Sequence, residues 1–132
     1  MILVDTSVWL DYLSRSPGPA GKELHRLIFE GEPLALTGIV VTEVLQGITR
    51  DVQQVEAFLL LFDLVEPKGL KTYVAAATLH RFARTRGITL STVDALIAAL
   101  AMEAKVALFS LDQDFVRVAS ITGLQLYPRK AE

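Results

Sequence analysis

MILVDTSVWLDY, residues 1–12, passes from a short apolar run through an acid into a helical pattern. Residues 2–4 are β-type, and Asp5-Thr6-Ser7 are residues that readily cap a helix. Apolar side chains then recur at helical spacing as far as Leu13, before the turn-forming residues 16–19. The stretch therefore predicts a strand that feeds directly into a helix, with Asp5 at the junction.

The same alternation of apolar runs and helical patterns continues along the chain. Further strands are expected at 34–36, 64–66, 106–109 and 124–126. Two helices are expected between the first and second strands, and two more between the second and third. A long helix follows at about 70–87, then a helix opened by Ser91 and another from about Asp112. Alternation of this kind predicts a mainly parallel central sheet covered on both faces, that is, a three-layer α/β/α fold. A chain of 132 residues fits a single domain, 1–132.

Composition limits the cellular setting. The longest purely apolar stretch, 95–102, is far too short to span a bilayer, so no membrane association is expected. The absence of cysteine excludes disulfides and thiolate chemistry, and an acid at position 5 without a basic leader argues against a secretory signal. A cytoplasmic location is expected. The net charge of -2 provides no global basic field of the kind that many duplex-binding proteins use.

Four acids lie at or just after strand-to-helix junctions: Asp5, Glu43, Asp94 and Asp112. In a parallel α/β sheet these junctions share the carboxyl edge, where ligands bind. Two carboxylates about 4 Å apart repel by roughly 4 kcal/mol at an effective dielectric of 20. Acids that converge there need protons or a divalent metal ion.

Each acid also has a purely structural explanation. Asp5 and Asp112 can be N-caps, Glu43 can stabilise the positive start of its helix, and Ser91 with Asp94 resembles a capping box. Asp94, however, lies in the strongly apolar segment 93–97, where a surface cap has no reason to be.

Carboxylates from separate elements favour hard ions such as Mg²⁺ or Mn²⁺ over zinc. The two histidines, His25 and His80, lack ligand spacing to each other and are expected on the surface. This argues against a two-histidine nuclease and a Ser-His-Asp hydrolase.

Four segments in order resemble the PIN-domain ribonucleases, in particular the toxins of VapBC-type toxin–antitoxin pairs. They are LVDTS (3–7), TEVLQG (42–47), DALIAALA (94–101) and SLDQDF (110–115). The third is the most specific, and Ser110 stands where threonine is common in the family.

The resemblance implies an endoribonuclease that depends on Mg²⁺ or Mn²⁺. Asp5, Glu43, Asp94 and Asp112 would hold one or two ions, with Ser7 and Ser110 hydrogen-bonding nearby and Asp114 in the outer shell. Whether Asp112 or Asp114 is the closer ligand stays open at this point. The implied partners are an RNA substrate and a cognate antitoxin protein.

Two surfaces suit such partners. Arg81, Arg84 and Arg86 are the densest basic group and can contact RNA phosphates, although a solvated helix face explains them equally. The second is an apolar surface larger than one buried helix face needs, which suits a homodimer or an antitoxin groove. It is made by Trp9, Phe58, Leu61 and Phe62.

Two alternatives differ in function. A phospho-accepting receiver-like domain also clusters acids and binds Mg²⁺, but it usually has two adjacent acids after the first strand, where Thr6 follows Asp5 here. A PIN-like module that binds RNA or protein without cutting is the other, and the presence of all four acids argues against it.

Overall fold

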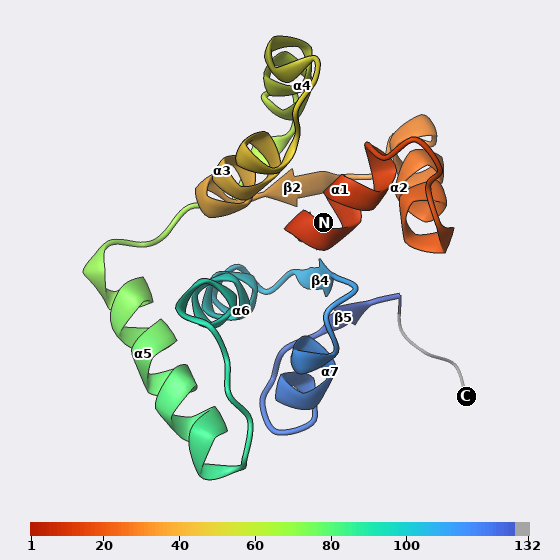
Figure 1. Ribbon diagram of the computed structural model, residues 1–132. Coiled ribbons are helices and arrows are strands. Elements are labelled where there is room, and N and C mark those ends of the chain that lie inside the picture. Colours follow the sequence, from red (N-terminus) through yellow and green to blue (C-terminus); the bar gives the residue numbers. More distant parts are fainter. Residues whose placement is uncertain (129–132) are drawn as a thin grey trace.

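The computed structural model describes residues 1–128, so the last four residues of the expected domain 1–132 lie outside it. The strands are β1 (Ile2–Val4), β2 (Leu34–Leu36), β3 (Asp63–Leu64), β4 (Ala107–Phe109) and β5 (Leu126–Tyr127). The helices are α1 (Thr6–Tyr12), α2 (Pro19–Phe29), α3 (Gly38–Gly47), α4 (Val52–Leu59), α5 (Leu70–Thr85), α6 (Thr92–Ala104) and α7 (Gln113–Ala119) (Figure 1).

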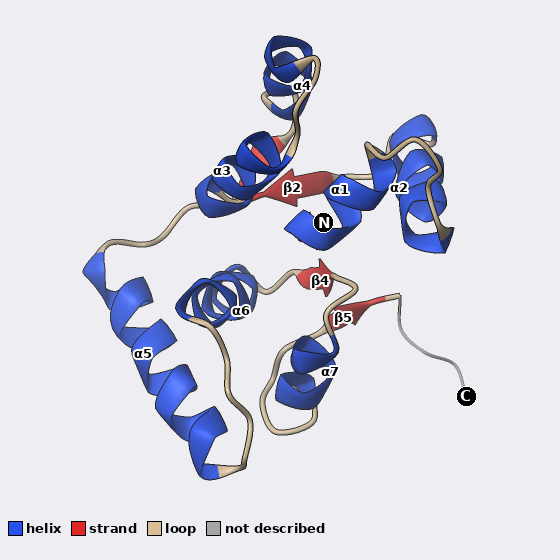
Figure 2. Cartoon of the chain, in the orientation of Figure 1, coloured by secondary structure: helices blue, strands red, loops and turns tan. Residues whose placement is uncertain are grey.

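The strands form one sheet in the order β3-β2-β1-β4-β5, and every pairing is parallel. After β1 and β2 the chain moves toward one edge of the sheet, and after β3 and β4 it moves toward the other. Because crossovers between parallel strands are right-handed, α1–α4 cover one face of the sheet and α5–α7 cover the opposite face. Figure 2 shows the two groups of helices on opposite sides of the strands. The predicted three-layer α/β/α fold with a mainly parallel sheet is confirmed.

The bounds predicted for two edge strands were wrong. β3 lies at 63–64 rather than 64–66, although the Val65 amide still donates to the Leu36 carbonyl at 2.8 Å. β5 lies at 126–127 rather than 124–126, because Leu126 and Tyr127 are the residues that pair with Leu108 and Phe109 of β4. Leu124 is buried in the loop before the strand. Apolar residues mark burial, and only the partner strand decides which of them join the ladder.

Trp9 belongs to the core, which corrects its assignment to a surplus apolar surface. Its side chain is fully buried, and its indole Nε1 donates to the Val4 carbonyl at 3.2 Å. The rings of Phe58 and Phe62 pack edge-on against it, with centroids 6.1 and 5.2 Å away. Helical spacing alone could not separate an interface aromatic from one that another helix covers.

Helices α1 and α2 approach closely at Gly21. A Cβ atom there would lie 2.9 Å from backbone atoms of Asp11 and Tyr12. The Asp11 carboxylate accepts hydrogen bonds from the amides of Gly18 (3.0 Å) and Gly21 (2.7 Å), and these bonds lower the pKa of Asp11. The contact holds the start of α2 against the end of α1, the helix that begins beside Asp5.

The crossover connections run toward opposite edges of the sheet on the two sides of the β1–β4 pair. Ligands of open α/β sheets bind at such a reversal, outside the carboxyl ends of the strands. Asp5 follows β1 and Ser110 follows β4, so both lie at this point. Within residues 1–128, no helix is long and apolar enough to cross a membrane.

Candidate metal centre

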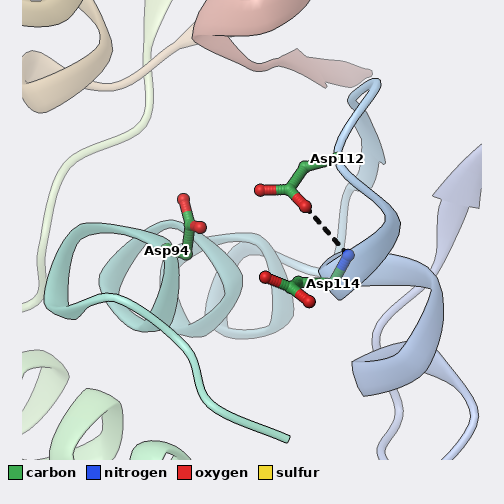
Figure 3. A group of neighbouring side chains, drawn as sticks. All are labelled: Asp94, Asp112 and Asp114. Atoms are coloured by element: carbon green, nitrogen blue, oxygen red, sulfur yellow. Dashed lines mark hydrogen bonds between the residues drawn. The ribbon is translucent and has the colours of Figure 1, made fainter.

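Three aspartates bring their carboxylates together at the carboxyl edge of the sheet. Asp112 is the N-cap of α7, and Asp114 lies in the first turn of α7. Asp94 lies in the first turn of α6, which follows helix α5, so the expected strand-to-helix junction was wrong for this residue. One carboxylate oxygen from each lies within 4.8 Å of the others, and all three residues are half-buried. Figure 3 shows the three side chains gathered around a common space between α6 and α7.

Asp112 both caps helix α7 and belongs to the cluster of three aspartates. Its Oδ1 accepts a hydrogen bond from the Asp114 amide at 2.9 Å, drawn as a dashed line in Figure 3, so the capping explanation holds for this residue. The cap also places Asp114 next to it in the cluster. Asp114, expected in an outer shell, thus has a carboxylate oxygen within the same 4.8 Å limit of Asp94 as Asp112 has.

Asp94 is the acid of the cluster whose ionisation the fold opposes. Burial, followed by the negative charges of Asp112 and Asp5, raises the pKa of Asp94 to about 6. The helix cap comes from Ser91, whose Oγ accepts a hydrogen bond from the Asp94 amide at 3.0 Å. The carboxylate of Asp94 is thus directed at other acids, an arrangement that a cation would relieve.

Asp5 is held by two hydroxyl groups. It occupies the N-cap position of α1, yet its side chain makes no cap hydrogen bond. Its Oδ2 instead accepts from Ser110 Oγ at 2.7 Å and from Ser7 Oγ at 3.1 Å. Ser110 Oγ in turn accepts from the Asp112 amide at 3.0 Å. Asp5, which is 5% exposed, is outside the group of three but is joined to it through Ser110.

Glu43 reaches the same edge from the opposite layer. It lies in the second turn of α3, and its Oε1 accepts a hydrogen bond from Thr6 Oγ1 at 2.7 Å. Glu43 is not in the group of three aspartates, but Thr6 is the residue next to Asp5. Sequence reasoning missed Thr6 because its partner is 37 residues away. A hydroxyl residue directly after the strand-ending acid was the available signal.

The arginine that contacts the cluster was also not among the candidates. Arg117 Nη1 pairs with Asp114 Oδ1 at 2.6 Å, and the i,i+3 spacing of the two residues was its signal. Arg81 and Arg84 are exposed on α5. Arg86 lies just beyond that helix, with its guanidinium 4.8 Å from the centroid of the Phe82 ring. These three arginines make no ion pair with the acids of the site within the described part of the chain.

The donor set fits a hard divalent cation. Carboxylate oxygens of Asp94, Asp112 and Asp114 converge, with Asp5 adjacent and the hydroxyls of Ser7 and Ser110 around it. Mg²⁺ and Mn²⁺ prefer such oxygen ligands, whereas zinc favours nitrogen or sulfur. An ion in this place would offset the mutual repulsion of the acids.

Comparisons with known proteins agree with the motifs. The family model described as PIN domain matches residues 2–121, which confirms the resemblance drawn from the sequence. Ribonuclease VapC11 from Mycobacterium tuberculosis is 33% identical over 129 residues, covering 95% of this chain and 96% of that protein.

Two solved structures share the fold. VapBC2 from Rickettsia felis, bound to a DNA fragment from the promoter, is 20% identical with a TM-score of 0.74, covering 96% of this chain and 97% of that one. VapC20 from Mycobacterium tuberculosis, a toxin that cleaves the sarcin–ricin loop, is 20% identical with a TM-score of 0.68. The match covers 89% of this chain and 94% of that one.

Proposed function

Because this chain belongs to the PIN domain family, we propose that it is a ribonuclease that acts as the toxin of a toxin–antitoxin pair. The name and near full-length match of the relative, Ribonuclease VapC11, support this activity. The observation that carries the chemistry is the convergence of Asp94, Asp112 and Asp114 beside Asp5. Such a cluster suits a nuclease whose positive charge comes from bound metal ions.

The proposed cofactor is Mg²⁺ or Mn²⁺. Asp5, Glu43, Asp94 and Asp112 would hold one or two ions, and Asp114 lies close enough to join them. A bound divalent ion makes an attached water a better nucleophile and offsets charge on the phosphoryl group. Ser7 and Ser110 keep the Asp5 carboxylate oriented, and the half-buried aspartates limit the water that can screen their charges.

The substrate class is RNA, and recognition must come from its shape. When water attacks the phosphorus, the ribose 2′-OH is not needed as nucleophile, so selectivity depends on unpaired bases and backbone contacts. The exposed arginines Arg81, Arg84 and Arg86 are the proposed phosphate contacts.

The proposed protein partners are a cognate antitoxin and a second copy of the chain. A protein of similar fold, with a TM-score of 0.71 and 22% identity, was solved in a toxin–antitoxin complex from Klebsiella pneumoniae. Here the end of α4 exposes Leu60 (68%) and Leu61 (79%) beside half-buried Phe58 and Phe62, an apolar surface that suits coverage by a partner. An RNA-cleaving toxin of this kind would act in the cytoplasm.

The decisive test is cleavage of RNA by the purified protein with Mg²⁺, with Mn²⁺ and with EDTA. Bulk transfer RNA and ribosomal RNA serve as probes, and the ends of the products are identified. We expect cleavage only with the metal ions and no 2′,3′-cyclic phosphate ends. Cyclic phosphates would overturn attack by water, because they require the 2′-OH as nucleophile. Binding of RNA without cleavage under any metal condition would favour the non-catalytic PIN-like module.

A further inference from the structure

Three consecutive residues after β1 contact both layers of the fold. Asp5 and Ser7 hydrogen-bond to Ser110, which follows β4 on the side of α7. Thr6, between them, hydrogen-bonds to Glu43 of α3, which covers the opposite face. The end of β1 is therefore the place where the two sets of acids are joined.

Glu43 has little else to hold it. Among the hydrogen bonds within residues 1–128, its carboxylate takes part in the one from Thr6 Oγ1, at 2.7 Å, through Oε1. It makes no ion pair within the same residues. The acids of the site carry the same sign of charge as Glu43, so electrostatics gives this flexible side chain no attraction toward them. Within residues 1–128, the donor that holds this carboxylate is the hydroxyl of Thr6, the residue next to Asp5.

Thr6 is suited to supply that donor. Its β-branched side chain restricts the χ1 angle, so the hydroxyl has few directions to point in. Oε1 of Glu43 accepts the hydrogen bond from this hydroxyl, and Oε2 takes part in no hydrogen bond within residues 1–128. In many metal sites, a group that hydrogen-bonds to a metal-binding carboxylate fixes the orientation of that carboxylate.

We infer that Thr6 is a positioning residue that holds Glu43 at the metal centre. The inference rests on the proposed function, because Glu43 has a ligand role only if the site binds an ion. Thr6 contributes no metal ligand of its own and acts through the Glu43 carboxylate.

The test measures Mn²⁺ affinity by calorimetry, independently of RNA cleavage. Thr6→Val removes the hydroxyl and keeps the shape, and we expect it to bind Mn²⁺ about 10 to 100 times more weakly than wild type. Thr6→Ser should restore affinity close to wild type. The matched control is Thr42→Val, since Thr42 precedes Glu43 and its hydroxyl, among the described residues, donates only to the Gly38 carbonyl of its own helix at 3.3 Å. This control should not change Mn²⁺ binding.

A double-mutant cycle separates positioning from a general structural role. If Thr6 acts through Glu43, Thr6→Val should cause no further loss of affinity in a Glu43→Gln background. Losses that add would overturn the inference, as would wild-type affinity in Thr6→Val. Melting in EDTA monitors folding, and Thr6→Ala replaces Thr6→Val if the valine variant is unfolded. A wild-type protein that binds no Mn²⁺ would overturn the proposed function together with this inference, whereas unchanged binding by Thr6→Val refutes the inference alone.

Discussion

Ser110 Oγ lies 2.7 Å from Asp5 Oδ2, although the two residues are 105 positions apart in the chain. The same oxygen accepts a hydrogen bond from the Asp112 amide at 3.0 Å. One hydroxyl therefore orients the acid at the end of β1 and the backbone of the acid that starts α7. Its loss would disturb two parts of the proposed metal centre at once.

Replacing Ser110 by alanine should lower RNA cleavage by about 10- to 100-fold, the usual effect of removing a group behind a metal ligand. Ser110→Thr retains the hydroxyl and should keep most of the activity. Cleavage rates at saturating Mg²⁺ and a Mg²⁺ titration of each variant check this expectation. Equal activity of Ser110→Ala and wild type would show that Asp5 needs no such support.

Asp94→Asn should abolish cleavage without harming the metal-free fold, because it relieves repulsion among the aspartates. In EDTA its melting temperature should equal or exceed that of wild type. Mg²⁺ at 100 times its dissociation constant stabilises wild type by about 2.7 kcal/mol through mass action, and the variant should lose this gain. Asp51→Asn is the control, since Asp51 also precedes a helix but is exposed and makes no side-chain cap bond. If Asp94 only supported its helix, both variants would respond to Mg²⁺ alike.

The unfolding free energy of the metal-free protein should depend on the protonation of Asp94 between about pH 4 and pH 6. The pKa of Asp94 is raised from 3.8 to about 6. A raised folded-state pKa means that the native state binds the proton more tightly, so this residue's contribution to stability falls as pH rises through that window. The difference in unfolding free energy between wild type and Asp94→Asn, from urea titrations in EDTA, should therefore grow in favour of wild type as pH is lowered from 7 to 4.5. A flat difference would contradict the arrangement of charges described for the site.

Gly21→Ala should destabilise the protein by about 1 to 3 kcal/mol, the usual cost of inserting a methyl group into tight packing. The reason is the distance of 2.9 Å from the new Cβ to the backbone of α1. Gly38→Ala is the matched control, because within residues 1–128 no atom lies within 4 Å of its Cβ position apart from its chain neighbours and the backbone of its own helix. Urea unfolding should show unchanged or slightly higher stability for the control. Equal effects of the two substitutions would mean that helix propensity, and not the contact between α1 and α2, sets the result.

Much of the fold could be predicted because its signals are local. Apolar runs such as 2–4 and 34–36 and the helical spacing between them predict a layered α/β fold without knowledge of any contact. The shifted bounds of β3 and β5 and the burial of Trp9 could not be predicted in this way. Each depends on a partner segment distant in the sequence, namely β2, β4 and α4.

Residue order by itself indicated that Asp5 and Asp112 follow strands, and the carboxyl ends of parallel strands share one edge of the sheet. It also indicated that Glu43 and Asp94 lie near the starts of helices, but α6 follows α5, so residue order did not fix the edge at which Asp94 lies. Only the tertiary structure decided which oxygens meet there. Asp94 faces Asp112 and Asp114 because α6 and α7 lie in the same layer, whereas Glu43 comes from the opposite layer and depends on Thr6. The physical reason is that periodicity specifies the end of an element, while the direction of a side chain at that end is set by packing and hydrogen bonds between elements remote in the chain.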